Sequence, residues 1–485
     1  MCLSLGSCSS PRFDIGRAVR TSQGAVPANV TGIRTKALTD SNPIISNIFC
    51  ADPTSIEYDG RLYIYGTCDH QQYEAVGADG ENTYEHIRSL VVLSTDDMAN
   101  YTYHGRIPVG EIAPWIMASW APSVVSRTED DGRTHFYMYF SDSGRGTGVI
   151  TAESPLGPWS DPLGKPLIDG RTKGLQGCKV PFDPGACIDD DGTGWLTFGG
   201  LGKECGRIVK LGSDMVSLDS EIVKLPAKHH FEANELNFIN GTYVYTYNTN
   251  WESHLEGWDT EKDGMPPPTC SMAYMTSKTP LDPDSWEYRD YYFKNPGEQG
   301  MEYSNNHTHL QKYGGRYYLF YHSQFMQRLM GTSGGFRSIC VDEAAVDEDT
   351  LTIEKVDASK KGTEQIKYLD PYSPVEAETA AVCAGIGYEQ TADGMYIKAE
   401  CGGDAAWSCV RGADLGDGSG YIAAKAKGHG TIEVRTGAPD GETAAVLCFD
   451  SDDMQTVYAD MHLSGVNDLF FVISDGIVFD SWQVK

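Results

Sequence analysis

A tight glycine turn followed by an aromatic run decides the fold, as in Gly314-Gly315-Arg316-Tyr317-Tyr318-Leu319-Phe320-Tyr321. This combination is typical of a hairpin turn that enters a β-strand. Four further copies precede it: Asp59-Gly60-Arg61-Leu62-Tyr63-Ile64-Tyr65, Gly132-Arg133-Thr134-His135-Phe136-Tyr137-Met138-Tyr139, Gly192-Thr193-Gly194-Trp195-Leu196-Thr197-Phe198 and Asn240-Gly241-Thr242-Tyr243-Val244-Tyr245-Thr246-Tyr247. We therefore expect five sheets built on the same hairpin.

The spacing of these turns indicates how the sheets are arranged. The glycines Gly60, Gly132, Gly192, Gly241 and Gly315 follow one another at intervals of 72, 60, 49 and 74 residues. Each interval is close to the size of a four-stranded blade with its loops, and the intervals are too irregular for a solenoid. The sequence predicts an all-β chain with a five-bladed β-propeller over residues 41–345. A large two-sheet sandwich is the alternative.

A polar residue stands eight or nine positions before each turn glycine. These residues are Asp52, Ser123, Asp183, Glu232 and His307. The innermost strand of each blade lines the propeller axis, so equivalent positions would point toward one another. An aspartate before a proline is ordinarily a turn former. Two such aspartates in register with a glutamate and a histidine favour a catalytic cluster instead.

Clustered carboxylates suit the hydrolysis of an acetal. Their mutual repulsion separates their pKa values, so one can stay protonated while another is ionised. The acid protonates the leaving oxygen and the base activates water. A third carboxylate can keep the pKa of the acid high. We expect a glycan-cleaving hydrolase that uses Asp52, Asp183 and Glu232, with acid and base roughly 6.5–9.5 Å apart if the reaction inverts configuration.

Several segments between about residues 43 and 340 form a recognisable set. They are Phe49-Cys50-Ala51-Asp52-Pro53, Trp120-Ala121-Pro122, Ser154-Pro155-Leu156-Gly157-Pro158-Trp159, Phe182-Asp183-Pro184, Asp189-Asp190-Asp191-Gly192, Phe231-Glu232-Ala233 and Tyr317-Tyr318-Leu319-Phe320-Tyr321-His322. Together they resemble glycoside hydrolase family 43, whose members are five-bladed propellers that invert configuration. The resemblance implies Asp52 as general base, Asp183 as pKa modulator and Glu232 as general acid. Glu235 is the rival acid, but the spacing to Asn240-Gly241 favours Glu232.

Other segments narrow the resemblance to the arabinofuranosidase and arabinoxylan arabinofuranohydrolase branch of that family. They are the stretch from Ala273-Tyr274-Met275-Thr276-Ser277 through Lys294-Asn295-Pro296-Gly297, Asn305-Asn306-His307 and Gly335-Phe336-Arg337-Ser338. They imply exo-acting release of α-L-arabinofuranosyl units from arabinoxylan-derived oligosaccharides, with β-xylosidase as a second activity. An endo-arabinanase and a non-catalytic glycan-binding propeller are the alternatives. The branch usually has two consecutive histidines after the asparagine, but Thr308 holds the second place here. This difference leaves open whether the channel binds a calcium ion.

Three residues are candidates for substrate binding. Aromatic residues make up 11% of the chain, and the apolar face of a sugar stacks on such rings. Trp120 is a candidate platform, with core packing as the alternative. His307 faces the expected channel, and Arg337 can either bind substrate or hold a carboxylate.

The C-terminal third predicts a separate domain. Residues 346–371 form a connector, and 372–485 contain short strand-like runs typical of a jelly-roll-like β-sandwich. The segments Val375-Glu376-Ala377-Glu378 and Phe479-Asp480-Ser481-Trp482 resemble the two ends of a family 6 carbohydrate-binding module. That resemblance implies a structural calcium ion near Glu378 and Asp480, and leaves sugar binding by this domain open.

Composition limits the partners of the chain. Its 485 residues carry a formal charge of −30, which disfavours nucleic acid and acidic membrane surfaces. We expect no organic cofactor. Residues 1–40 are expected to form a polar tail. The odd count of 13 cysteines lacks CxxC pairs and favours a reducing compartment. We expect a cytoplasmic protein, with secretion and an absent signal segment as the alternative.

Overall fold

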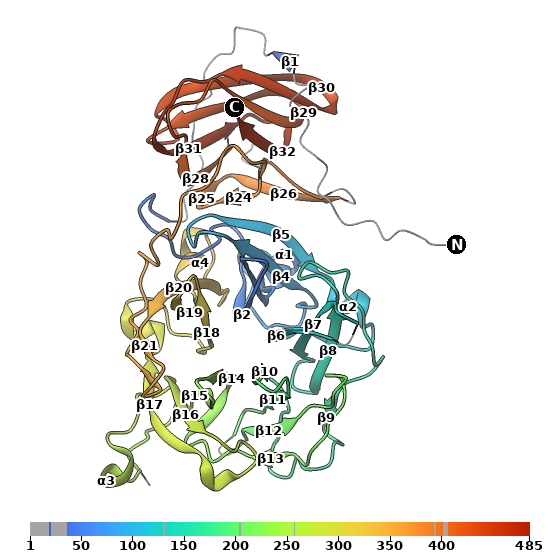
Figure 1. Cartoon of the computed structure of the whole chain (residues 1–485), viewed down its shortest axis with the longest axis vertical. Coiled ribbons are helices and arrows are strands. Elements are labelled where there is room, and N and C mark those ends of the chain that lie inside the picture. Colours follow the sequence, from blue (N-terminus) through green and yellow to red (C-terminus); the bar gives the residue numbers. More distant parts are fainter. Residues whose placement is uncertain are drawn as a thin grey trace. The chain divides into compact units, whose positions relative to one another are not determined.

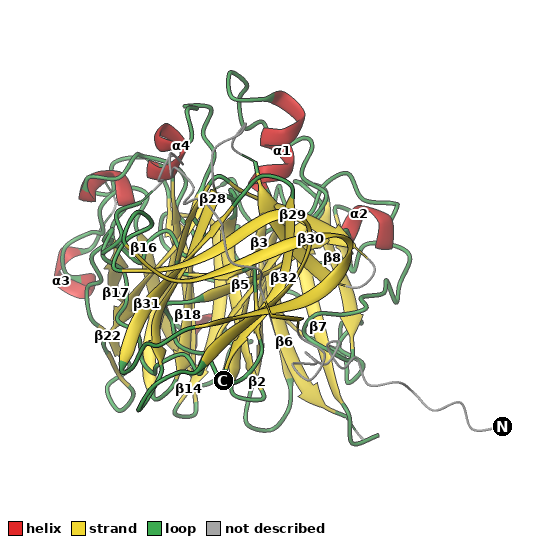
Figure 2. Ribbon diagram, turned by 90° about the horizontal axis from the view of Figure 1, so that it is seen from above, coloured by secondary structure: helices red, strands yellow, loops and turns green. Residues whose placement is uncertain are grey.

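The computed structural model describes residues 19–20, 36–129, 131–202, 205–256, 258–391, 394–400 and 406–485. Strands dominate the chain, and the helices are short and lie in connecting loops (Figure 2). The helices are α1 (Asp69–Val76), α2 (Val109–Ile112), α3 (Thr260–Asp263), α4 (Phe325–Leu329), η2 (Pro283–Ser285) and η3 (Pro296–Gln299). No helix in the described part of the chain has the length and apolar character that crossing a membrane requires.

The chain divides into two compact units. The first comprises residues 36–96 and 104–364, and the second contains 97–103, 365–485 and the described N-terminal residues. The first unit is a five-bladed β-propeller (Figure 1). The predicted all-β fold, a propeller followed by a sandwich-like domain, is confirmed.

The propeller is built from four blades with four strands each and a fifth blade with three. Blade one contains β2 (Ala51–Tyr58), β3 (Arg61–Thr67), β4 (Leu90–Thr95) and β5 (Tyr101–Ile107), and blade two contains β6 (Trp120–Thr128), β7 (Thr134–Ser141), β8 (Gly146–Ala152) and β9 (Ile168–Asp169). Blade three contains β10 (Gly185–Ile188), β11 (Gly194–Phe198), β12 (Arg207–Lys210) and β13 (Val223–Lys224), and blade four contains β14 (His230–Ile239), β15 (Thr242–Thr249), β16 (Met272–Ser277) and β17 (Glu287–Phe293). Blade five contains β18 (Thr308–Tyr313), β19 (Arg316–Ser323) and β20 (Ser338–Ala344). Each predicted hairpin joins the first two strands of its blade.

The aromatic runs have a packing reason. Each blade lies between two others, so both faces of its second strand are buried. In β7, Phe136 and Met138 pack into the core shared with blade one, whereas Tyr137 and Tyr139 pack into the core shared with blade three. The strand therefore needs large apolar side chains at consecutive positions, which explains why it lacks the polar alternation of a half-buried strand.

The first strands of the blades form a closed ring. β2, β6, β10, β14 and β18 lie next to one another in this order, and β18 returns to β2 (Figure 1). Four of these blades open with a left-handed residue at or just before the first strand. These residues are Asp52 (φ 49°), Ala121 (φ 43°), Asp183 (φ 50°) and Ala233 (φ 57°). In β2, β6 and β14 the left-handed residue lies in a β-bulge.

Side chains of the preceding blade satisfy the backbone N–H of every one of these left-handed residues. Asp52 donates to His322 Nδ1 (3.1 Å), Ala121 to Thr67 Oγ1 (2.8 Å), Asp183 to Ser141 Oγ (2.8 Å) and Ala233 to Asp183 Oδ2 (2.9 Å). We call these four bonds the upper ring. They join four of the five neighbouring pairs of blades, all except blades four and five, at the point where the catalytic candidates emerge.

A lower ring of bonds follows two or three residues further along the inner strands. Here Ser55 donates to His309 Nε2 (3.0 Å), Val124 to Thr54 Oγ1 (3.2 Å), Ala186 to Ser123 Oγ (2.9 Å) and Leu310 to Glu235 Oε1 (3.1 Å). Between blades three and four, Gly185 replaces the side-chain acceptor. A Cβ at this position would lie 2.6 Å from the Cα of Glu235, so only glycine permits the close approach of these strands.

The rings correct one expectation from the sequence. Ser123 and Glu232 were expected at positions equivalent to Asp52 and Asp183, and this is wrong. Ser123 lies two residues after the left-handed Ala121 and belongs to the lower ring, whereas Glu232 lies one residue before the left-handed Ala233. The bulges and the unequal hairpin loops shift the register, so counting back from the turn glycine misplaces these side chains by one or two positions.

The second unit contains one strongly bent sheet with the order β25-β28-β31-β29-β32-β27-β26. Its strands are β1 (Val19–Arg20), β23 (Val375–Glu376), β25 (Val382–Ala384), β26 (Ile386–Thr391), β27 (Gly394–Ala399), β28 (Ala406–Asp414), β29 (Tyr421–Thr436), β30 (Glu442–Asp460), β31 (Val466–Ile473) and β32 (Ile477–Val484). The short strand β24 (Thr379–Ala380) does not join this sheet and pairs with Tyr101 and Thr102 of β5 instead. A short hairpin of β21 (Val346–Asp347) and β22 (Thr352–Ile353) lies between β20 and β23 in the chain. Phe471, Phe479 and Trp482 lie in its core. Trp407 is buried as well, so its ring is not an exposed platform for sugar.

The lower ring predicts a stability effect at Ser123. Ser123→Ala leaves the buried N–H of Ala186 without its acceptor, which should lower the free energy of unfolding by ~1–3 kcal/mol. Urea denaturation measures the change. Ser126→Ala, on the same strand but outside both rings, is the matched control. Equal stability of the two variants would contradict a structural role for the ring.

Candidate active site

One cavity collects most of the residues singled out in the sequence. It is lined by Asp52, Tyr84, Trp120, Ala121, Phe182, Asp183, Glu232, Asn305 and Arg337. The three carboxylates therefore come from blades one, three and four, at residues 52, 183 and 232, and share one small space. Its volume of about 110 Å³ is well below the ~300 Å³ at which pockets for larger organic ligands begin.

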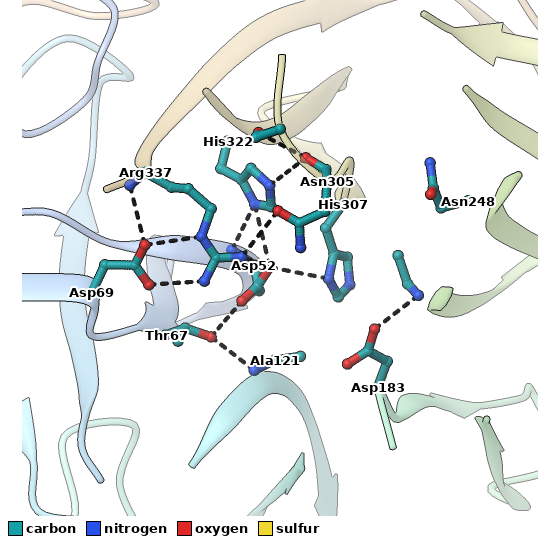
Figure 3. Close-up of polar contacts among 12 residues, drawn as sticks. Asp52, Thr67, Asp69, Ala121, Asp183, Asn248, Asn305, His307, His322 and Arg337 are labelled. Atoms are coloured by element: carbon teal, nitrogen blue, oxygen red, sulfur yellow. Dashed lines mark hydrogen bonds and ion pairs between the residues drawn. The ribbon is translucent and has the colours of Figure 1, made fainter. Parts of the chain in front are cut away.

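Asp52 is the most firmly held of the three carboxylates (Figure 3). Its Oδ1 accepts a hydrogen bond from Arg337 Nη1 at 3.0 Å, and its Oδ2 accepts one from Thr67 Oγ1 at 2.7 Å. Burial raises the pKa of Asp52, but the Arg337 guanidinium and the nearby His307 outweigh it and hold the pKa well below its usual range. Asp52 is thus ionised and keeps a fixed orientation, as a general base requires.

Two histidines flank Asp52, and their pKa values are shifted in opposite directions. His322 Nδ1 accepts the N–H of Asp52, while His322 Nε2 lies 2.9 Å from the carbonyl oxygen of Asn305. The proton therefore resides on Nε2 and the ring is neutral, in line with the lowering of its pKa by burial. His307 Nδ1 lies 3.4 Å from Asp52 Oδ1. Burial lowers the pKa of His307, but Asp52 and the other two carboxylates raise it above its usual value.

Asp183 and Glu232 are shifted in the opposite direction from Asp52. Burial raises the pKa of Asp183 to about 6, and Asp52 adds to this while His307 opposes it. Burial raises the pKa of Glu232 to about 8, with the Asp183 charge as the second cause. Near pH 7 the cavity therefore holds an ionised Asp52 and a protonated Glu232. This division provides a base and an acid in one site.

Asp183 also positions Glu232 through the backbone. Its Oδ2 accepts the N–H of Ala233, the residue that follows Glu232, at 2.9 Å. The same carboxylate therefore raises the pKa of Glu232 and fixes the chain that carries it. The arrangement can donate a proton to a leaving oxygen and activate water within one cavity.

Arg337 is tied to two carboxylates. Besides Asp52, it forms a two-pronged pair with Asp69, through Nε at 2.9 Å and Nη2 at 2.8 Å. The guanidinium also lies over the Tyr84 ring, 4.9 Å from its centre. The observed role of Arg337 is therefore to hold carboxylates. It also lines the cavity, but contact with substrate stays a prediction.

Trp120 and His307, the other two substrate-binding candidates, occupy different places. Trp120 lines the cavity and donates its indole N–H to the carbonyl oxygen of Tyr84 at 3.2 Å, which fixes the plane of the ring. His307 is buried beside Asp52 and does not line the cavity. It interacts with the carboxylates, and binding of substrate by His307 stays a prediction.

Sequence reasoning missed four contributors: Asp69, Tyr84, Phe182 and Asn305. Phe182 directly precedes Asp183, and Asn305 lies two residues before His307. Their positions next to predicted site residues could have identified them. Tyr84 and Asp69 lie in the long loop between β3 and β4. No periodic pattern marks that loop, so the sequence carries no comparable signal for them.

Glu235, the rival acid, has a structural role. Its carboxylate is 2.6 Å from His309 Nδ1 and accepts the N–H of Leu310 in the lower ring. His309 Nε2 accepts the N–H of Ser55, so the ring proton is on Nδ1, which donates a hydrogen bond to Glu235. Glu235 is occupied by these bonds and does not line the cavity.

The predicted calcium ligands lie in the second unit. Glu378 is buried, its Oε2 has no hydrogen-bond partner among the described residues, and burial raises its pKa well above the usual value. Asp480 Oδ2 is paired with Lys425 Nζ at 2.9 Å. The described residues contain no group of three or more histidine, cysteine or acidic side chains that could hold a metal. Since calcium takes 6–8 oxygen ligands, these two acids alone provide only part of the ligand set that the ion needs.

Comparison with known proteins identifies the family. Residues 41–350 match the profile of Glycosyl hydrolases family 43. The chain belongs to glycosyl hydrolase family 43. It is 34% identical to the arabinoxylan arabinofuranohydrolase of Bacillus subtilis (strain 168), over 92% of this chain and 93% of that protein. It is 32% identical to the arabinoxylan arabinofuranohydrolase of Paenibacillus polymyxa, over 92% of this chain and 74% of that protein.

Solved structures of family 43 agree with this assignment. A Bacillus subtilis arabinoxylan arabinofuranohydrolase in complex with cellotetraose superposes with a TM-score of 0.85 at 33% identity, covering 94% of this chain and 99% of that chain. An α-L-arabinofuranosidase from Clostridium thermocellum gives a TM-score of 0.52 at 32% identity, covering 67% of this chain and 98% of that chain. The chain is therefore a glycoside hydrolase, and its substrate is a carbohydrate.

The pKa of Glu232 predicts the alkaline side of the pH profile. Activity requires the protonated acid, so kcat/KM should fall as pH rises through about 8. Asp183→Asn removes a negative charge beside Glu232 while its amide oxygen can still accept the N–H of Ala233. The alkaline limb of the variant should shift to lower pH. An unchanged limb would mean that Asp183 does not control the acid.

The role of Glu232 predicts a dependence on the leaving group. Glu232→Gln should lower kcat about 10²–10⁴-fold for an oligosaccharide, whose leaving alcohol needs a proton. An aryl glycoside with an acidic phenol should lose much less, because its leaving group departs as an anion. Steady-state rates on both substrates provide the measurement. Glu235→Gln is the matched control and should show no such difference between substrates.

Proposed function

We propose that this family 43 hydrolase is an inverting, exo-acting α-L-arabinofuranosidase that releases arabinofuranosyl units from arabinoxylan-derived oligosaccharides, with β-xylosidase as a second activity. The observation that carries the proposal is the pairing of an ionised Asp52 with a protonated Glu232 on one cavity. Two relatives that match over 92% of this chain are named arabinoxylan arabinofuranohydrolases, which supports the choice of substrate.

The dimensions of the cavity support exo action. About 110 Å³ leaves room for a single small sugar ring, whereas an endo-acting enzyme must hold rings on both sides of the bond that it cleaves. Arabinofuranose and xylose are both pentoses with similar hydroxyl geometry, so one such pocket can accept either. Trp120 supplies an aromatic surface and Arg337 and Asn305 supply hydrogen-bond donors for the hydroxyl groups.

A structural calcium ion in the second unit is a secondary part of the proposal. Its support is the buried Glu378 Oε2, which has no donor among the described residues, and the proximity of Glu376 and Asp480 that contributes to the raised pKa of Glu378. These acids would hold the ion, and its charge would stabilise their ionised forms. The pairing of Asp480 with Lys425 is the observation against it.

The cytoplasm is the proposed location. The ten cysteines that the structure describes form no disulfide with one another, which supports a reducing compartment. The substrate would then be imported oligosaccharide rather than polymer.

Assays with aryl α-L-arabinofuranoside and aryl β-xyloside test the proposed specificity. The arabinofuranoside should be hydrolysed with the higher kcat/KM, and proton NMR should show a product of inverted anomeric configuration before mutarotation. Asp52→Asn should abolish release, because an amide cannot activate water, while leaving substrate binding intact. Release from neither glycoside, or retention of configuration, would refute the proposal.

A further inference from the structure

A second cavity lies on blade two and has no role in the chemistry described above. Its volume is about 440 Å³. It is lined by Trp115, Asp142, Arg145, Gly164, Lys165, Pro166, Asp169, Gly170 and Arg171. These residues come from the loop between β5 and β6, the tight turn between β7 and β8, and the segment around β9.

This cavity is a close neighbour of the catalytic one. Asp142 lines it and directly follows Ser141, whose Oγ accepts the N–H of Asp183 at 2.8 Å. Asp142 Oδ1 accepts the backbone N–H groups of Met117 at 2.6 Å and Ala118 at 3.2 Å. Trp120, two residues further, lines the catalytic cavity. Asp142 therefore connects the wall of the second cavity to the segments that carry Asp183 and Trp120 in the wall of the catalytic cavity.

The acids of the second cavity are already used inside the protein. Asp142 holds the loop before Trp120, as described above. Asp169 is bound by Arg171, through Nε at 3.0 Å and Nη2 at 2.6 Å. By contrast, the side chains of Arg145 and Lys165 have no ion pair or hydrogen bond with the described residues. Two cations without partners in one cavity stand out in a chain of net charge −30.

An aromatic ring accompanies these cations. Trp115 donates its indole N–H to Asp161 Oδ2 at 2.6 Å, and its ring stacks on Phe140 with centres 6.3 Å apart. The ring is therefore held in place where it lines the cavity. Gly170 lines the same cavity and faces open space, because a Cβ there would meet no atom within 4 Å. A fixed aromatic ring beside cationic donors suits a sugar that carries a carboxylate.

We propose that this cavity binds a uronosyl branch, a sugar carboxylate carried by the same polysaccharide as the arabinofuranosyl unit. Arg145 and Lys165 pair with the carboxylate, and Trp115 supports the sugar ring. The proposal rests on the proposed function only in taking the ligand to be a branched xylan fragment. It makes the cavity a determinant of substrate choice that is separate from the catalytic residues.

Calorimetry on the inactive full-length Glu232→Gln variant tests the proposal. The probes are xylotriose with one glucuronosyl branch, unbranched xylotriose and inorganic phosphate. The branched probe should bind at least about tenfold more tightly than xylotriose at low salt, and the advantage should shrink toward 1 M NaCl. Adding Arg145→Gln and Lys165→Gln should remove the advantage and leave the affinity for xylotriose unchanged.

Lys278→Gln is the control for net charge, since it removes one positive charge from an exposed position outside the cavity. It should preserve the preference for the branched probe. Equal affinity for both trisaccharides, retention of the preference in the double variant, or binding of phosphate but not of the uronosyl probe would overturn the proposal. In the otherwise native enzyme, the double variant should hydrolyse aryl α-L-arabinofuranoside normally. Failure of the proposed function would instead appear as no such activity in the unaltered chain.

Discussion

The hydrogen bond from each left-handed residue to a side chain of the preceding blade is the contact on which the site depends. Left-handed backbone costs an ordinary residue about 1–2 kcal/mol, so it persists only where the surroundings favour it. Here the side chains of Thr67, Ser141, Asp183 and His322 bind the N–H groups that this backbone exposes. The bonds join the blades and set the direction of Asp52 and Asp183. The same four contacts thus join four of the five pairs of neighbouring blades and place the carboxylates, and the lower-ring bond from Leu310 to Glu235 joins the fifth pair.

Charge balance explains how three carboxylates share so small a space. Arg337 neutralises Asp52 and is itself held by the buried Asp69, so the base stays ionised. Glu232 has no such partner and lies near the charge of Asp183, so burial keeps it protonated. His307 lies 3.4 Å from Asp52, and its hydrogen bond to that carboxyl helps to lower the pKa of Asp52. The opposite shifts of Asp52 and Glu232 therefore arise from their neighbours, since Arg337 and two histidines contact Asp52, whereas Glu232 lies near the negative charge of Asp183.

The fold could be predicted from the sequence because the hairpin pattern repeats five times and the aromatic runs indicate that both faces of the second strands are buried. Sequence reasoning also selected Asp52, Asp183 and Glu232, which share the cavity, although it expected Glu232 in the wrong register. The bulges explain this error, because a single left-handed residue such as Ala233 changes the side to which its neighbours point. Asp69 and Tyr84 escaped notice because their contacts depend on how a long loop folds back. Such contacts are set by tertiary packing and leave no local pattern.

The proposed chemistry depends most directly on the protonation of the carboxylates in the resting enzyme. Carbon-13 NMR of protein labelled at the side-chain carboxyl carbons, with Asp52→Asn, Asp183→Asn and Glu232→Gln for assignment, would report each group through a pH titration. Glu232 should be neutral at pH 7 and lose its proton near pH 8, while Asp52 should stay ionised at pH values well below the usual pKa of an aspartate. An ionised Glu232 or a protonated Asp52 at pH 7 would contradict the proposed chemistry.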